Sequence, residues 1–266
     1  MLTHNIELDA KSVAKLSKKG LSLQHLKEQL NHELDLSLEI WRAQGLNVVK
    51  HQGYYYFDTA FVPIEEAEFC IVDIETNGSK IEKHQIIEIA AVKVRNKKIV
   101  DRFESLVYTE EINPHITDIT GISAADTQDF PQLATVLQKF KLFLDDAVFV
   151  AHDVKFDYMF ISKSLEKIGL EPLLNRSLCS LALAERTIVS YRYALSYLND
   201  ALSLNPNAQH HRAMSDVLTT YGLFLLSLEN LPEDIKTVED LINFSKEAKR
   251  LKRPKLDPLQ EEKREN

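Results

Sequence analysis

Hydrophobic residues recur at helical spacing in three short stretches near the start of the chain. The first stripe contains Val13 and Leu16, the second begins at Leu23 and the third at Leu36, and such spacing predicts amphipathic helices. The segment VVKHQGYYYF follows and is typical of two strands joined by a turn that contains glycine. We therefore expect residues 1–62 to form a small helical, winged-helix-like module. Three roles stay open for it: DNA binding, docking of a partner, or a purely structural role.

The pattern changes at about Glu66, where three apolar segments of strand length follow one another. They are EFCIVDI, QIIEIAAVKV and KIVDRFESLVY, and Asn96 and Lys97 lie in the turn between the second and the third. Short turns between consecutive strands imply an antiparallel meander. The first half of this domain is therefore predicted to be an antiparallel sheet.

Helical and strand patterns then alternate. PQLATVLQKFKLFL has the apolar stripe of an amphipathic helix, VFVAH is a short strand, and a helix is expected from about Val154. A fifth strand is expected near 177–181 and a last long helix over 212–228. Together with the meander, this order predicts an α/β domain over residues 66–229, with a mixed five-stranded sheet and flanking helices.

A further pattern begins with a capping box formed by Thr237 and Asp240. Six basic residues and one acid follow from Lys246 to Lys255. Such a run is typical of a solvated helix face, with a DNA or partner contact as the alternative. We predict that residues 230–266 form a basic amphipathic helix and a disordered tail.

The composition is that of an ordinary soluble protein, with 44% hydrophobic and 27% charged residues. The sequence has no pattern of a secretory signal and no apolar run long enough to span a bilayer, and the lone Cys70 and Cys179 indicate no zinc site. We expect a cytoplasmic location and no membrane partner. The net charge of −8 disfavours broad attraction to duplex DNA. It permits an enzyme that grips a few nucleotides through metal ions, which supply local positive charge.

Two acids project together from the end of the first strand of the α/β domain. Asp73 and Glu75 in IVDIETNG stand two residues apart, and side chains at that spacing share one face of a strand. Like charges at ~4 Å repel by about 4 kcal/mol at intermediate dielectric, and a divalent cation between them removes that penalty. Taken alone, such a pair is more often a solvated strand end than a metal site.

Two later segments each add an acid. Asp157 in FVAHDVKFDYMF lies about one turn into a helix, a position that the helix dipole favours for any carboxylate. Asp216 in HHRAMSDVLTTYG is embedded in an apolar helix, and His211 lies five residues before it. A neutral imidazole suits proton transfer near neutral pH, whereas a lone histidine at a helix start also fits a surface cap.

The motifs DxET, AHxxxFD and HRAxxD, in this order, are far more specific than any one of them. On these motifs, and on QIIEIAAVK and ITGISAADT, the segment from Glu66 to Glu229 resembles the DEDD exonucleases, and within them the proofreading exonucleases of the DNA polymerase III epsilon type. The histidine branch (DEDDh) is indicated because His211 precedes Asp216 by five residues, while the tyrosine of the other branch would stand at Arg212. The predicted elements are compatible with the ribonuclease H-like fold of this family.

The resemblance implies a metal centre and a general base. Asp73, Glu75, Asp157 and Asp216 would hold two divalent ions, Mg²⁺ or Mn²⁺, and His211 would be the base.

Four further positions follow from the same resemblance. Thr76 and Gly78 match family positions whose backbone lies near the terminal nucleotide. His210 is the weaker candidate for the base because its spacing is off by one. Asp153 stands where the family usually has Asn, and we expect it to cap the following helix as Asn would.

The function implied is 3′→5′ hydrolysis of terminal phosphodiester bonds in single-stranded or frayed DNA ends, with nucleoside 5′-monophosphates as products. Proofreading in DNA replication would require a partner such as the catalytic subunit of DNA polymerase III. An exoribonuclease of the same superfamily is the nearest alternative, since nothing in the sequence distinguishes the sugar. A non-enzymatic DNA-binding regulator on a nuclease-like scaffold is the alternative from another class, and the intact set of five residues speaks against it.

Overall fold

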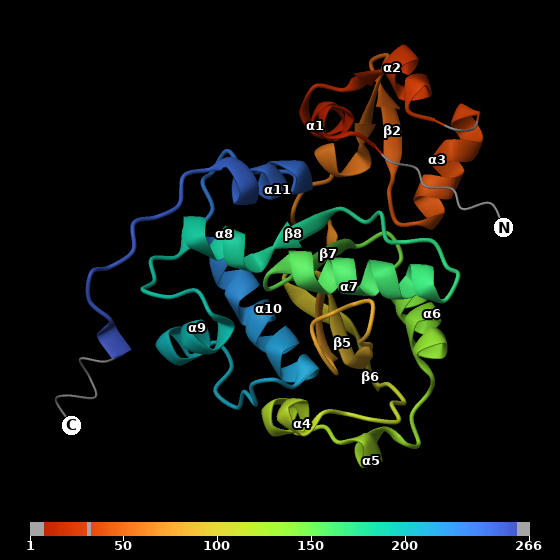
Figure 1. Cartoon of the computed structure of the whole chain (residues 1–266). Coiled ribbons are helices and arrows are strands. Elements are labelled where there is room, and N and C mark those ends of the chain that lie inside the picture. The colour runs from red at the N-terminus through yellow and green to blue at the C-terminus, as the bar shows by residue number, and fades with distance from the viewer. Residues whose placement is uncertain (1–7, 31–32, 260–266) are drawn as a thin grey trace.

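The computed structural model describes residues 8–30 and 33–259 of the chain. It contains an N-terminal module, a central α/β domain and a C-terminal segment that contacts both (Figure 1). The expectations of no secretory signal at residues 1–7 and of disorder at 260–266 concern residues outside the described part. Within that part, no helix is both long and apolar enough to cross a membrane.

The N-terminal module packs helices on a small antiparallel sheet. Its elements are α1 (Ala10–Lys18), β1 (Leu21–Ser22), α2 (Leu23–Glu28), α3 (Leu34–Ala43), β2 (Val48–His51), β3 (Tyr54–Phe57) and the 3₁₀ helix η1 (Asp58–Ala60). The sheet has the order β1-β3-β2, and Trp41 and Phe57 are buried in a separate core. The helices and the hairpin agree with the sequence pattern, whereas β1 is not part of it. The assignment to the winged-helix class and DNA binding by the module stay predictions.

The central domain is built on the mixed five-stranded sheet that the sequence predicts. Its strands are β4 (Glu68–Thr76), β5 (Ile86–Arg95), β6 (Lys98–Leu106), β7 (Val148–Ala151) and β8 (Ser177–Cys179). They lie in the order β6-β5-β4-β7-β8, with antiparallel pairing among β4, β5 and β6 and parallel pairing of β4 with β7 and of β7 with β8. Asn96 and Lys97 have positive φ angles of 48° and 60°, as a tight hairpin turn requires.

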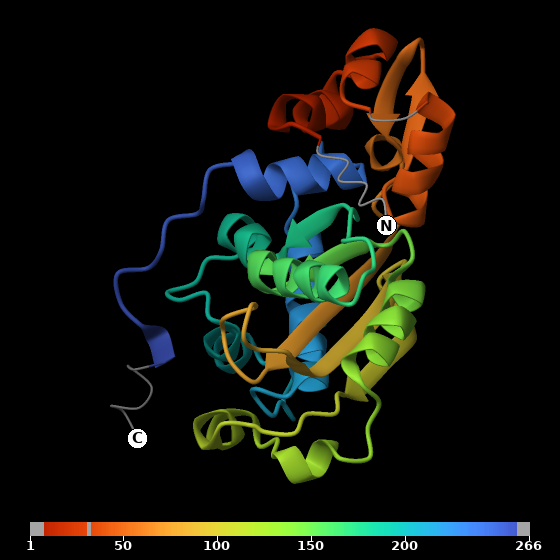
Figure 2. The same ribbon diagram turned by 45° about the vertical axis from the view of Figure 1, so that its right-hand side comes forward.

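Helices cover both faces of this sheet. The helices that follow β6 in the chain are α4 (Pro114–Thr120), α5 (Ala124–Thr127), α6 (Leu133–Leu144), α7 (Val154–Lys167), α8 (Ser180–Thr187), α9 (Leu195–Leu202), α10 (Ala213–Glu229) and α11 (Val238–Glu247); of these, α6 and α7 lie on one face of the sheet and α10 on the other. Cys70, Val72 and Ile74 of β4 pack toward α6 and α7, whereas Phe69 and Ile71 pack toward α10. Figure 2 shows α7 in front of the strands and α10 behind them. Alternate side chains of β4 therefore pack into two separate cores.

The C-terminal segment departs from the predicted basic helix. The capping box of Thr237 and Asp240 is present, but α11 ends at Glu247. Of the predicted basic run only Lys246 lies on the helix, and the chain continues as an extended strap (residues 248–256). The prediction of one basic amphipathic helix was therefore wrong for most of the run.

Contacts with α8 explain why the helix stops. The Arg186 guanidinium donates to the backbone carbonyl oxygens of Lys246 and Ala248, at 3.0 and 2.7 Å. The buried Glu185 carboxylate pairs with Arg250 of the strap at 3.0 Å. Arg186 therefore occupies two carbonyl oxygens that a longer helix would have used, and Glu185 holds the strap against α8.

A buried carboxylate joins the N-terminal module, the central domain and α11. Glu239 is 1% exposed, and it accepts hydrogen bonds from the hydroxyls of Ser17 at 2.5 Å and Thr59 at 2.8 Å. Arg176 approaches the same carboxylate with Nε at 2.5 Å and Nη2 at 2.9 Å. The module is therefore held against the domain by a satisfied polar cluster rather than by a loose linker.

Candidate active site

Two acids of β4 lie on the face of the sheet that α10 covers. Asp73 and Glu75 continue the row of side chains that begins with the buried Phe69 and Ile71. Because alternate strand residues share a face, both carboxylates emerge where this apolar row ends. Each is only partly exposed to solvent.

The ladder between β4 and β5 changes register just beyond these acids. Glu75 lies opposite Glu88 of β5, and the pairing shifts between Glu75 and Thr76. Such bulges are frequent beside active sites because they re-aim side chains. Gly78 has a φ of 153°, and a Cβ there would lie 2.5 Å from the His84 ring. The segment 76–78 thus leaves the sheet through a turn that favours glycine.

Asp157 reaches the same end of the sheet from α7. The helix follows directly on β7, the parallel neighbour of β4, so its first turn lies beside the strand end that carries Asp73. Asp157 is 4% exposed, and the backbone of Ile74 acts to lower the pKa of its carboxyl group against the effect of burial. The sheet topology therefore brings together acids that are far apart in the chain.

The junction between β7 and α7 is held by a histidine. His152 Nε2 donates to the carbonyl oxygen of Tyr193 at 2.8 Å, and its Nδ1 lies 3.0 Å from the Ser180 hydroxyl oxygen. Burial lowers the pKa of His152, which favours the neutral ring. We therefore interpret the histidine of the AHxxxFD motif as structural.

Asp153 departs from the expectation placed on it. It occupies the N-cap position of α7, but with a left-handed backbone (φ 67°, ψ 58°) and no side-chain capping bond. A capping side chain needs an extended backbone to reach the free amides of the first turn. The prediction that Asp153 caps this helix as Asn would was therefore wrong.

The start of α10 supplies the fourth acid and two histidines. The Asp216 side chain is 13% exposed, and the His211 backbone amide donates to its Oδ2 at 3.0 Å. Atoms of Glu75, His211 and Asp216 that can bind a metal lie within 4.8 Å of one another. His210 is also close, with Nδ1 3.8 Å from Oδ1 of Asp216. The structure thus brings His211 to Glu75 of β4 and to Asp216, and His210 to Asp216.

The four carboxylates oppose one another's ionisation. Burial and the charges of the other three raise the pKa of Asp73 well above its usual range. Burial and the charge of Asp216 raise the pKa of Glu75 to about 8, and burial raises the pKa of Asp157 to about 8. Burial also raises the pKa of Asp216, against a hydrogen bond from His211. Such a cluster is stable in its charged form with a cation among the acids, and its oxygen donors suit Mg²⁺ or Mn²⁺.

Sequence reasoning missed a fifth acid on the same face. Glu88 is 1% exposed, accepts from Arg212 Nη2 at 2.9 Å and from the Ala213 amide at 2.9 Å, and lies opposite Glu75. Its signal was visible as the one acid inside the mostly apolar QIIEIAAVKV.

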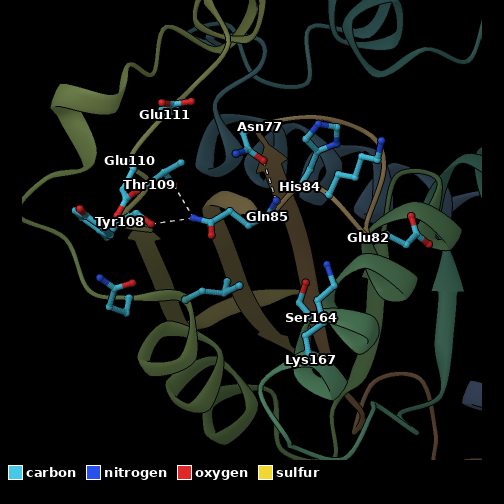
Figure 3. A pocket seen from close by; sticks show the side chains of 13 residues that line it. Asn77, Glu82, His84, Gln85, Tyr108, Thr109, Glu110, Glu111, Ser164 and Lys167 are labelled. Atoms are coloured by element: carbon cyan, nitrogen blue, oxygen red, sulfur yellow. Dashed lines mark hydrogen bonds between the residues drawn. The ribbon is translucent and has the colours of Figure 1, made fainter.

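A polar pocket of about 450 Å³ lies beside the segment that follows β4 (Figure 3). Gln85 crosses it, and its amide donates to the Tyr108 carbonyl oxygen at 2.8 Å and to the Thr109 hydroxyl at 2.7 Å. Asn77 accepts from the Gln85 backbone amide at 2.8 Å. None of the four acids or His211 lines this pocket, so it is a neighbour of the acid cluster rather than part of it.

The fold and the acid cluster together are those of a nuclease, and comparison with known families agrees. Residues 70–224 match the model of the Exonuclease family (RNase_T). Because this match spans more than half of the 266 residues, the chain belongs to the Exonuclease family. The family resemblance inferred from the sequence motifs is confirmed.

The relatives found by sequence include proteins named DNA polymerase III PolC-type. The one from Caldanaerobacter subterraneus subsp. tengcongensis is 36% identical over 216 residues, which cover 77% of this chain and 15% of that protein. The one from Staphylococcus haemolyticus is 33% identical over 172 residues, or 64% of this chain and 12% of that protein. The chain thus spans a small fraction of the length of these relatives.

Solved structures of exonucleases share the fold. Exonuclease X in complex with 5′ overhanging duplex DNA is 26% identical, with a TM-score of 0.53 over 66% of this chain and 99% of that chain. An E. coli exonuclease I complex with single-stranded DNA is 16% identical, with a TM-score of 0.58 over 63% of this chain and 42% of that chain. The second likeness concerns the fold alone. Together these structures support the predicted ribonuclease H-like architecture.

Proposed function

We propose that this protein is a metal-dependent 3′→5′ exonuclease that removes nucleotides one at a time from DNA ends and releases nucleoside 5′-monophosphates. The observation that carries the proposal is the convergence of four acids on one end of the sheet, with His211 beside two of them. Membership of the Exonuclease family and the PolC-type relatives support the reaction class and the DNA substrate.

The acid cluster would hold two divalent ions. Asp73, Glu75, Asp157 and Asp216 supply only oxygen donors, and their raised pKa values mark a site that a cation would stabilise. Two such ions, when bound, supply Lewis-acid stabilisation of the charge that develops on a phosphoryl group during in-line displacement. The protein's part is to hold these donors in place on rigid elements.

His211 would accept the proton of the attacking water. Its ring lies at the rim of the cluster and is exposed, so a water molecule can approach it. The backbone hydrogen bond to Asp216 restrains the residue without using the ring nitrogens. His210 is the weaker candidate because its spacing from Asp216 is off by one from the family motif.

Thr76 and Gly78 would contact the terminal nucleotide through their backbone. They follow the acids of β4 closely in the chain, and Gly78 has a positive φ with the His84 ring packed where a Cβ would lie, so this backbone position favours glycine. We expect single-stranded or frayed 3′ ends to fit best, because the net charge of −8 offers little attraction to a long duplex.

The PolC-type relatives suggest proofreading beside a replicative polymerase in the cytoplasm. The partner that we propose is the catalytic subunit of DNA polymerase III, and the chain covers 15% or less of the PolC-type relatives. The N-terminal module and the C-terminal strap are the surfaces outside the nuclease domain that are free for such a contact. Co-purification of the full chain with that subunit would test the association.

The activity is tested with matched 5′-labelled DNA and RNA oligonucleotides in the presence of Mg²⁺ or Mn²⁺. We expect a ladder that shortens from the 3′ end, 5′-monophosphate products, and preference for DNA. Faster cleavage of RNA would favour an exoribonuclease. Absence of cleavage on both, with wild-type protein that still binds DNA, would favour the non-enzymatic regulator.

A further inference from the structure

Glu88 is an acid buried in the middle of a sheet with no role in the proposed reaction. Its side chain is 2% exposed, and it occupies the face of β5 that meets α10. An ionised carboxylate in such a place is costly unless charged or polar groups satisfy it. The partners of Glu88 therefore indicate what it is for.

All of those partners belong to the first two residues at the start of α10. Arg212 donates to Oε1 through Nη2 at 2.9 Å and through Nε at 3.3 Å, and the Ala213 backbone amide donates to Oε2 at 2.9 Å. Arg212 is the N-cap residue, and its own side chain makes no capping bond. N-caps are normally Ser, Thr, Asp or Asn. Here Glu88, a strand residue 125 positions before Ala213, supplies the acceptor that the helix lacks.

The residue before this cap is the proposed base. His211 has a φ of 61°, a left-handed conformation that is strained for a non-glycine residue. Such a conformation persists where neighbouring contacts enforce it. Here the His211 amide binds Asp216 on one side, and Glu88 holds the next two residues on the other.

The charge of Arg212 has a second consequence. Glu88 lies directly opposite Glu75 on the sheet, and its charge raises the pKa of Glu75 while that of Arg212 lowers it. Paired with Arg212, Glu88 is a satisfied acceptor. Unpaired, it would add a fifth negative charge to the acid cluster.

We propose that the Glu88–Arg212 ion pair is a positioning device that locks the start of α10 onto the sheet, and with it His211 and Asp216. This inference rests on the proposed exonuclease function and deepens it. Neither residue is among the proposed metal ligands, the proposed base or the positions proposed to contact DNA. The pair sets the distance between the base on α10 and the acids on β4, and displacement of a reacting group by about 1 Å costs on the order of 100-fold in rate.

The first variant is Glu88→Gln, which keeps the size and one acceptor but loses the charge. We expect kcat on single-stranded DNA to fall by about 10–100-fold, while KM changes by less than about 3-fold because the positions that contact DNA are untouched. A purely structural loss would lower the folded fraction and leave kcat per folded molecule unchanged. Circular dichroism and an active-site titration separate the two.

Arg212→Lys provides a second variant that is safe for folding, because the Arg212 side chain is 42% exposed. It keeps the charge and loses the planar guanidinium that can donate two hydrogen bonds at once, so we expect a smaller fall in kcat than for Glu88→Gln.

Mn²⁺ binding, measured by calorimetry, is a readout that does not depend on turnover. Glu88→Gln should weaken this binding because Asp216 shifts. The matched control is Glu104→Gln, which removes an exposed acid near Arg212 and should change kcat by less than about 2-fold.

If the wild-type protein is active and Glu88→Gln keeps the same kcat and Mn²⁺ affinity, the positioning role is overturned and the exonuclease function stands. Wild-type protein that cuts neither DNA nor RNA and binds no Mn²⁺ would overturn both. Equal falls in kcat for Glu88→Gln and Glu104→Gln would show a general effect of charge, and would also overturn the proposal.

Discussion

The backbone amide of His211 hydrogen-bonds to the carboxylate of Asp216 at 3.0 Å, five residues along the chain. The proposed base and a proposed metal ligand are therefore parts of one local structure at the start of α10. Their spacing in the sequence therefore matters. A histidine one position nearer to or farther from Asp216 would direct its ring away from Glu75, with which the His211 ring shares a cluster.

The first prediction concerns the two adjacent histidines. His211→Ala should lower kcat by about 10²–10⁴-fold, the usual contribution of a general base, and leave DNA affinity nearly unchanged. His210→Ala is the matched control and should retain most activity. Single-turnover rates and fluorescence anisotropy measure the two quantities. If His210→Ala is the slower variant, the assignment of the base must be exchanged.

The second prediction concerns the acid cluster. Asp73→Asn should lower activity by about 10³-fold or more, since metal stabilisation of transition-state charge is worth several kcal/mol. The same change should raise the melting temperature measured in EDTA, because it removes one of four acids whose charges oppose one another. A variant that loses activity and also melts earlier without metal would contradict the electrostatic argument.

A third prediction follows from the direction of the pKa shifts. The folded-state pKa of Glu75 is raised to about 8 from 4.5, so the folded protein binds this proton more tightly than the unfolded chain. For such an acid, stability is highest below the unfolded pKa and falls as the pH rises toward the folded pKa. In EDTA the melting temperature should fall by on the order of 5 °C between about pH 5 and pH 8.

Glu75→Gln should flatten this pH profile, and saturating Mn²⁺ should flatten it in the wild type. Differential scanning calorimetry with and without the ion checks both. A profile that rises steadily toward pH 8 in EDTA would mean that these acids are not the groups that control metal-free stability.

Much of the site could be predicted from local patterns. Asp73 and Glu75 share a face because strand side chains alternate, and the order of strands placed Asp157 at a strand-to-helix junction. Glu88 could be suspected as an acid in an apolar strand. Its partner Arg212 could not, because 124 residues separate the two and only the folded sheet brings them together.

The elements that the sequence did not predict are short or depend on distant contacts. Four helices (α4, α5, α8 and α9) have at most eight residues each, too few for a clear apolar stripe. The strap after Glu247 carries the composition of a helix, but Arg186 binds the carbonyl oxygens at its start. Local propensity is a weak signal, and tertiary contacts override it.

The last prediction concerns the contact between the N-terminal module and the nuclease domain. Glu239→Gln should lower the free energy of unfolding by about 3–5 kcal/mol, because Arg176 would lose its partner while its side chain is 14% exposed. Lys18 and Glu247 form an exposed ion pair in which the Glu247 side chain is 63% exposed. The control Glu247→Gln removes this pair and should lower the free energy of unfolding by about 0–1 kcal/mol. Urea denaturation measures the free energy of unfolding of both variants.

Limited proteolysis should cut Glu239→Gln between the module and the domain sooner than Glu247→Gln. Equal costs for the two variants would mean that the module is held by apolar packing, and that the buried carboxylate contributes no more than a surface pair.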